Sequence, residues 1–77
     1  MLILREENDD SIISYYNSTD VKRSTYNKSE NKMTITFVKG ERTFLYENVN
    51  IKDYTEFEKN KSQGQAIRIF LKKYKHK

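Results

Sequence analysis

The sequence predicts a small α+β domain, in which an antiparallel β-meander is covered on one face by one or two C-terminal helices. Two observations predict this fold. Residues 33–46 alternate between apolar and polar, as in a β-hairpin with one buried face, and residues 50–74 carry apolar side chains at helical spacing. A single hairpin is unstable in water, so the helices are expected to cover it. The 77 residues suffice for one domain with a thin core.

The first part of the chain is expected to add strands to this hairpin. Residues 2–5 can form a short strand and residues 12–16 a second one, with the polar residues 8–10 as the turn between them. Residues 21–26 alternate weakly, but the polar run 27–31 after them is typical of a turn. Residues 21–26 are therefore assigned to a strand that enters the main hairpin.

The main hairpin is expected to turn at Lys39-Gly40. Gly40 and Gly64 are the two glycines of the chain, and each is expected where the backbone needs a positive φ or a close approach. Period-2 spacing places five large side chains on one face of the two strands: Met33, Ile35, Phe37, Phe44 and Tyr46.

Two capping signals follow the hairpin. Asn50 can cap a first helix, with Asp53 in the capping-box position, and Ser62 can cap a second one, with Gln65 in that position. The second helix is expected to pack one apolar stripe on the sheet and to present its basic residues to solvent. The stripe consists of Ala66, Ile67, Phe70, Leu71 and Tyr74.

The net charge of +4 is unevenly distributed. Residues 1–20 hold one arginine and five acidic residues, a net −4, whereas residues 21–77 hold fourteen basic and six acidic residues, a net +8. A basic body attracts polyanions, of which nucleic acid is the commonest in a cell, although lysines at a C-terminus also serve solubility and complement a helix dipole. The absence of cysteine fits a reducing, cytoplasmic location. The apolar start ends after three residues, too few for a signal peptide or a membrane span, so a soluble protein is expected.

Several short motifs together resemble the KTSC domain, a small module found alone in bacterial and phage proteins and at the C-terminus of some lysyl-tRNA synthetases. The matching positions are Ser18-Thr19-Asp20-Val21, Tyr26-Asn27, Met33-Thr34-Ile35-Thr36-Phe37 with Gly40, Phe44-Leu45-Tyr46, Val49, Tyr54, Phe57, Ser62-x-Gly64, Ile67, Leu71 and Lys72. Three positions depart from the family: Asn50 replaces its proline, Arg68 an asparagine and Lys72 an arginine. The resemblance implies a domain over residues 18–77, preceded by an acidic N-terminal extension, residues 1–17, that can add one or two strands.

The resemblance implies no catalytic residue and points to RNA binding, through the family's attachment to a tRNA-handling enzyme. The residues themselves also allow nucleic-acid binding, because basic side chains on the last helix and the hairpin turn can neutralise phosphates. RNA is expected before DNA. The basic candidates are Lys39, Arg42, Arg68, Lys72, Lys73 and Lys75. Four rings are candidates for stacking on an unpaired base: Phe44, Tyr46, Tyr54 and Tyr74. The alternation of the hairpin favours a core role for Phe44 and Tyr46, and Tyr74 is assigned to the apolar stripe of the helix.

A second hypothesis is a protein partner. The high Lys, Asn, Tyr and Ile usage suggests an AT-rich coding genome, such as that of a phage or a low-GC bacterium. A phage or prophage accessory protein can modulate a host protein or defence complex, here through Asp9, Asp10, Tyr15 and Tyr16 of the acidic segment. Tyr15 and Tyr16 must point to opposite faces of an extended strand, so at least one is expected at the surface. A third hypothesis is self-association through an exposed edge strand in this segment.

Catalysis is not expected. His76, the only histidine, is the penultimate residue, where it lacks the fixed geometry of an acid-base group or a metal ligand. Glu56 and Glu58 lie two residues apart on the expected helix, point in different directions, and are assigned to the solvated surface. The sequence has no Cys or His cluster and no phosphate-binding glycine loop, so no metal and no cofactor are expected.

Overall fold

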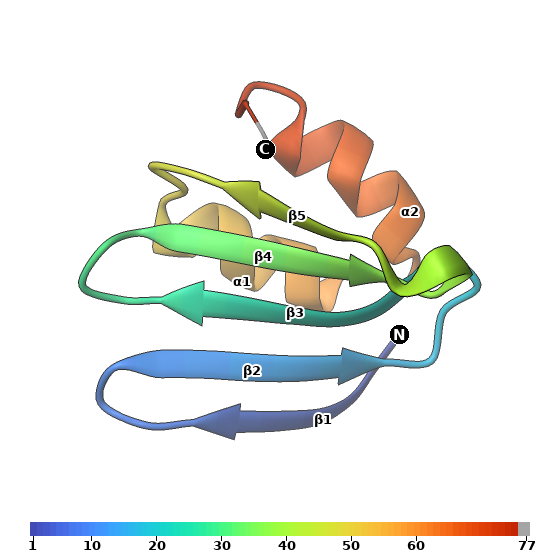
Figure 1. The fold of residues 1–77 in the computed structure, drawn as a ribbon, viewed down its shortest axis with the longest axis horizontal. Helices are drawn as coiled ribbons and strands as arrows, with labels where there is room; N and C mark the ends of the chain where they lie inside the picture. The colour runs from blue at the N-terminus through green and yellow to red at the C-terminus, as the bar shows by residue number, and fades with distance from the viewer. Residues whose placement is uncertain (76–77) are drawn as a thin grey trace.

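The computed structural model describes residues 1–75 and confirms the α+β architecture (Figure 1). Five strands form one antiparallel sheet in the order β1-β2-β3-β4-β5, so each strand pairs with its neighbour in the chain. The elements are β1 (Leu2–Glu7), β2 (Ser11–Tyr16), β3 (Val21–Asn27), β4 (Lys32–Phe37), the 3-10 turn η1 (Lys39–Glu41), β5 (Thr43–Tyr46), α1 (Ile51–Lys59), α2 (Gln63–Ala66) and the π-helical turn η2 (Ile67–Leu71).

Residues 1–17 supply the first two strands of this sheet. The turn between β1 and β2 is closed by Asn8, whose Oδ1 accepts hydrogen bonds from the backbone N–H groups of Asp10 and Ser11, both at 2.8 Å. β2 then pairs with β3, with Ile12 opposite Tyr26. The acidic segment is therefore continuous with the sheet that the main hairpin belongs to.

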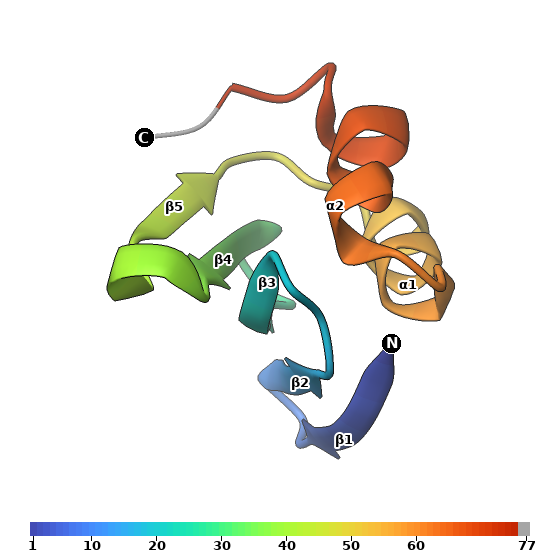
Figure 2. The same cartoon turned by 90° about the vertical axis from the view of Figure 1, so that its right-hand side faces the viewer.

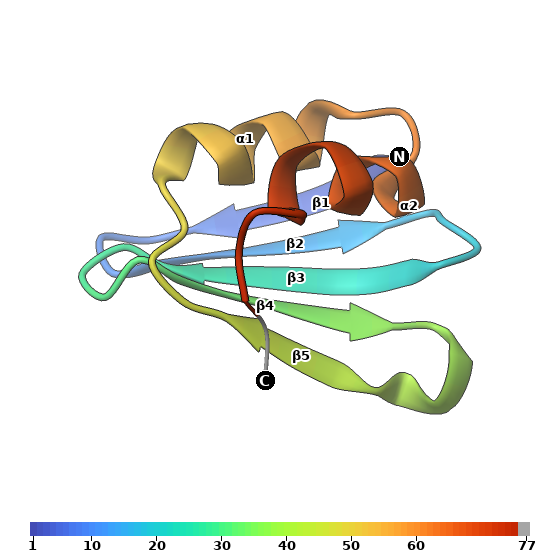
Figure 3. The same cartoon turned by 90° about the horizontal axis from the view of Figure 1, so that it is seen from above.

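The core lies between the sheet and the helices, which cover one face only (Figures 2 and 3). Inward-facing residues alternate along the strands, and α1 closes the core with two rings. Phe57 meets Tyr16 edge-on at 5.6 Å between ring centroids, and Tyr54 lies 4.9 Å from Tyr26. The fully inward set is Ile12, Tyr16, Val21, Tyr26, Met33, Ile35, Tyr46, Val49, Tyr54, Phe57, Ala66 and Leu71.

The main hairpin has the expected strands but a longer turn. Met33 pairs with Tyr46 and Ile35 with Phe44, which confirms the predicted shared face. The turn includes the predicted Lys39-Gly40 but extends beyond it, because the chain reverses through η1, where Gly40 has φ 72° and Glu41 φ 49°. The positive φ predicted for Gly40 is confirmed.

The helix starts are confirmed, whereas the end of the last helix differs. Asn50 Oδ1 accepts from the Asp53 N–H at 2.8 Å, and Ser62 Oγ accepts from the Gln65 N–H at 3.3 Å. α2 runs into η2, which ends at Leu71, so the helix stops three residues before Tyr74.

Gly64 confirms the other predicted use of glycine, a close approach. A methyl group at Gly64 would collide with the carboxylate of Asp20, which precedes β3. The missing side chain at Gly64 thus lets the start of α2 lie against the β2–β3 connection.

Glu58 was expected at the surface, and this prediction was wrong. Its side chain is 5% exposed and points from α1 toward the sheet, where its carboxylate accepts hydrogen bonds from Ser14 Oγ and from Arg5 Nε, the latter at 2.9 Å. The ion pair with Arg5 and the Ser14 hydroxyl replace the lost hydration of the carboxylate. Hydrogen bonds continue from Ser14 through the hydroxyl groups of Tyr54, Ser24 and Tyr16. Glu56 is only half-buried.

The other face of the sheet carries no helix of the described residues (Figure 2). Strand partners in register share a face, so two cross-strand rows line it, consisting of Ile13, Thr25, Thr34 and Leu45, and of Tyr15, Arg23, Thr36 and Thr43. Within residues 1–75, no helix has the length and apolar character needed to span a membrane.

Candidate nucleic-acid interface

Positive charge is segregated between the two layers of the fold. Residues 50–75, which form the helical layer, contain seven basic and three acidic residues, whereas residues 1–49, which form the sheet, contain seven basic and eight acidic ones. Glu58, one of the three acids of the helical layer, is buried against Arg5 of the sheet. The surface of the helical layer is therefore more basic than its sequence count of +4 suggests.

All four predicted cations of the last helix are exposed. Three of them, Arg68, Lys72 and Lys75, make no ion pair with another residue of the described chain. Arg68 and Lys72 are four residues apart and so lie on the same side of the helical turn. Both are available to an external anion.

Lys73 differs from these three cations because it already has a partner. Its Nζ lies 3.0 Å from Asp53 Oδ2 and 5.3 Å from the centroid of the Tyr74 ring. The hydrogen bond and the charge of Asp53 raise the pKa of the Lys73 ammonium. Lys73 is thus a weaker candidate for a phosphate contact than its neighbours.

Tyr74 ties the end of the chain to the start of α1. Its hydroxyl donates to Asp53 Oδ2 at 2.6 Å and accepts from Asn50 Nδ2 at 3.1 Å. The predicted Asn50–Asp53 capping box is therefore only half formed, because the Asp53 carboxylate binds Tyr74 and Lys73 instead of the Asn50 N–H. Burial alone would raise the pKa of the Asp53 carboxyl, but these hydrogen bonds and the Lys73 charge lower it on balance.

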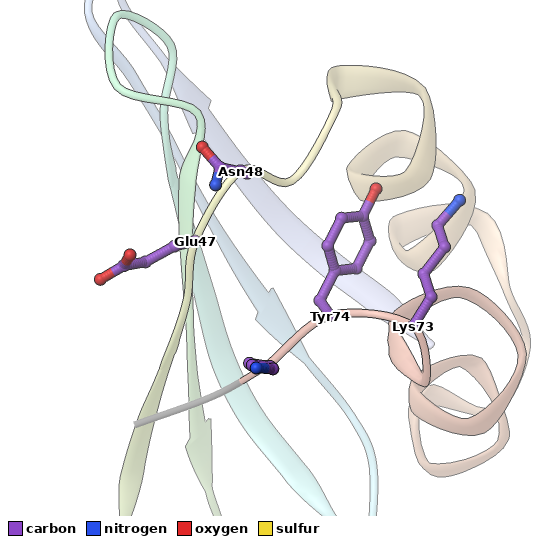
Figure 4. A pocket seen from close by; sticks show the side chains of 5 residues that line it. Glu47, Asn48, Lys73 and Tyr74 are labelled. Atoms are coloured by element: carbon purple, nitrogen blue, oxygen red, sulfur yellow. The ribbon is translucent and has the colours of Figure 1, made fainter.

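A pocket of about 380 Å³ lies between this C-terminal segment and the chain after β5 (Figure 4). In Figure 4 Tyr74 and Lys73 stand side by side, whereas Glu47 points away from them. The other lining residues are Asn48 and Lys75. Lys73 is already paired with Asp53, so it adds little to this pocket as a site for a phosphate.

The hairpin turn brings Lys39 and Arg42 together with two rings. Phe37 and Phe44 meet edge-on at 5.2 Å between centroids, and the Arg42 guanidinium lies 6.0 Å from the Phe44 centroid. With Gly40, these residues line a pocket of about 490 Å³, and both cations are exposed. We call these five residues the hairpin pocket.

Phe37 was assigned only to the core and was missed as a site residue. The signal that could have found it is its position, last in its strand and next to the turn. Both rings are half-buried, and the turn extends to the side away from the helices (Figures 2 and 3). Part of each ring therefore remains uncovered.

The four N-terminal candidates do not form one surface. Asp9 and Asp10 are exposed at the tip of the β1–β2 turn. Tyr15 follows Asp10 by five residues of extended chain, which corresponds to a distance of about 17 Å. Tyr15 is half-buried on the face without helices. Tyr16 is only 6% exposed and donates or accepts a 2.7 Å hydrogen bond with Ser24 in the core, so its proposed role in contacting a partner was wrong.

β1 is an edge strand, as the hypothesis of self-association requires. Two of its residues are exposed apolar side chains, Ile3 at 64% and Leu4 at 54%, and Met1, which precedes the strand, is 60% exposed. Such an edge offers unpaired backbone groups and apolar side chains to a further strand.

Within residues 1–75, no three His, Cys, Asp or Glu side chains are placed to hold a metal ion. The carboxylate of Glu58 and the hydroxyl of Ser14 are buried and hydrogen-bonded to each other. His76 lies outside the described residues.

Comparisons with known proteins identify no relative. No protein-family model matches the chain, and neither a curated protein nor a solved structure matches it. The resemblance to the KTSC domain therefore stays a prediction.

Proposed function

We propose that this protein is a non-enzymatic, cytoplasmic module that binds nucleic acid, RNA before DNA, through the basic helical layer and the β4–β5 turn. The observation that carries the proposal is the segregation of charge, which leaves exposed cations without acidic partners on one layer of a small protein. RNA is ranked above DNA as the expected ligand because of the resemblance to the KTSC domain. Cations without fixed partners suit phosphate groups and read no sequence.

The number of available cations sets the expected salt dependence. Five of the six predicted cations have no ion pair in the described chain: Lys39, Arg42, Arg68, Lys72 and Lys75. If all five contact a single strand, a plot of the logarithm of the association constant against the logarithm of the salt concentration has a slope of about −3.5. The affinity then falls about 100-fold between about 50 and about 200 mM salt.

The test is fluorescence anisotropy with labelled single-stranded RNA, single-stranded DNA and duplexes of both. Binding at about 50 mM salt with a steep salt dependence supports the proposal. No binding at that salt overturns it and leaves the lysines as charges that maintain solubility.

A matched pair of charge reversals locates the surface. Lys72→Glu lies on the helical layer and should weaken binding and, on a single strand, reduce the magnitude of the salt slope by about 0.7. Lys32→Glu makes the same change in net charge at the β3–β4 end of the sheet, where Lys32 has only a solvent-exposed 3.7 Å contact with Glu30 to lose, and should have a smaller effect. Equal effects would show that only net charge matters. Lys73 is avoided because its reversal would also break the contact with Asp53.

The second candidate, binding of a host protein by a phage accessory protein, rests on Asp9 and Asp10. Their carboxylates are exposed and make no ion pair in the described chain. Deletion of residues 1–17 is unsuitable as a test, since it removes two strands and the core residues Ile12 and Tyr16. The double reversal Asp9→Lys with Asp10→Lys should abolish partner capture under this candidate, and unchanged capture would contradict it.

A further inference from the structure

The hairpin pocket combines two features that core packing does not require. Its floor is made of two aromatic rings that the helices leave partly uncovered, and its rim carries two exposed cations. No acidic residue lines it. Glu41, the acid of the same turn, is paired with Lys22 at 2.6 Å. The rim therefore keeps its positive charge.

This chemistry fits a planar ring system that is flanked on both sides by negatively charged groups. Aromatic faces bind nucleobases by stacking, in a manner that tolerates any base, and an arginine beside the ring adds a second planar surface. Lysine and arginine on the rim can bind the flanking phosphates. Its volume of about 490 Å³ lies within the range of small-molecule sites.

We propose that the hairpin pocket holds one unpaired nucleotide of a single strand, with its base against Phe44 and Phe37 and its phosphates on Lys39 and Arg42. The inference rests on the proposed function and specifies its ligand. A base inside a duplex is stacked on both sides and cannot enter the pocket. The protein should therefore prefer single strands to duplexes of the same sequence.

The test compares Phe44→Leu with the unmodified protein on single-stranded RNA and DNA of about 12 nucleotides and on the matching duplexes. Leucine keeps an apolar side chain at the floor but removes the ring. Affinity for the single strands should fall about tenfold with an unchanged salt slope, because stacking involves no counterion release. Arg42→Gln should instead reduce the magnitude of the salt slope by about 0.7. Comparing the RNA with the DNA arm shows whether the ribose hydroxyl contributes.

Tyr15→Leu is the matched control, because it removes one ring from the opposite face of the sheet. Its affinity should equal that of the unmodified protein. A second measurement uses the unmodified protein alone, so it does not depend on the folding of a variant. The ring-proton NMR signals of Phe37 and Phe44 should shift when the single strand is added.

The outcomes separate this inference from the proposed function. Binding by the unmodified protein together with an unchanged Phe44→Leu affinity, or with unmoved ring signals, overturns the pocket and leaves the basic surface in place. Failure of the unmodified protein to bind any nucleic acid overturns both. A tenfold loss on single strands alone, with Tyr15→Leu unaffected, supports the pocket.

Discussion

Replacing Arg5 by methionine should destabilise the protein through a residue 53 positions away, Glu58. The Arg5 guanidinium is the cation that faces the buried Glu58 carboxylate, with 2.9 Å between Arg5 Nε and Glu58 Oε2. Methionine keeps most of the apolar stem of arginine, so the change removes the charge and the hydrogen bond but little packing. Among residues 1–75, the carboxylate is then left with Ser14 as its one remaining hydrogen-bond donor.

The magnitude follows from the exposure of the two side chains. Breaking a fully buried ion pair costs about 3–5 kcal/mol, because one charge stays buried without its partner. Glu58 is 5% exposed, but Arg5 is 34% exposed, and water screens its end of the pair. We therefore expect a loss of about 2 kcal/mol, against a total stability of about 4–12 kcal/mol for a chain of this length.

Chemical denaturation followed by circular dichroism measures this loss, and a double-mutant cycle assigns it. Glu58→Gln removes the buried charge but can still bond Ser14, so the double variant with Arg5→Met should be less destabilised than the sum of the single variants by about 1 kcal/mol or more. Glu7→Gln is the control, since it breaks only the exposed contact of Glu7 with Arg5 and Lys28, and should change stability little. An Arg5→Met variant within about 0.5 kcal/mol of the unmodified protein, or additive single variants, would refute the reasoning.

Three further predictions concern the core, the C-terminal segment and the edge of the sheet. Tyr54→Phe leaves the hydroxyls of Ser14 and Ser24 short of a partner and should cost about 1–2 kcal/mol in urea denaturation; no measurable loss would show that the hydroxyl chain is dispensable. The pKa of Asp53 is lowered in the folded protein, so its contribution to stability is present above the unfolded value of about 4 and is lost as the pH falls through the lower folded value. The thermal midpoint should therefore drop on acidification less in Asp53→Asn than in the unmodified protein, and equal drops would argue against this linkage. The exposed β1 edge predicts a mass in solution that exceeds one chain at high concentration and returns to one chain in Leu4→Lys; a single-chain mass at every concentration would exclude self-association through β1.

Local patterns predicted the elements whose cause is local. The alternation around Met33 and Ile35 is a property of neighbouring residues, and so are the caps at Asn50 and Ser62, and all of them appear as expected. The extension of the turn beyond Gly40 was missed, because a positive φ at Glu41 has no signature in a glutamate.

The features that escaped prediction depend on residues distant in sequence. Burial of Glu58 is possible only because Ser14 and Arg5, which lie 44 and 53 residues earlier in the chain, arrive beside it when the sheet folds under α1. Tyr74 lies outside the helical stripe, because its hydroxyl donates a hydrogen bond to Asp53, 21 residues earlier in the chain. The hairpin pocket was missed for a different reason: its residues are close in sequence, but the alternation assigned Phe37 and Phe44 to the core and left Lys39 and Arg42 as separate cations.

The strand order has a consequence for how the chain folds. Every strand pairs with the one that follows it, so each pairing closes a loop of only a few residues, and the entropy lost in loop closure is small at each step. Such a meander should fold within about milliseconds, faster than sheets whose strands cross over. The helices come last in the chain, and their docking joins Glu58 to β1 and β2. Refolding of Arg5→Met should therefore proceed at nearly the normal rate, with the effect of the substitution appearing mainly in the rate of unfolding.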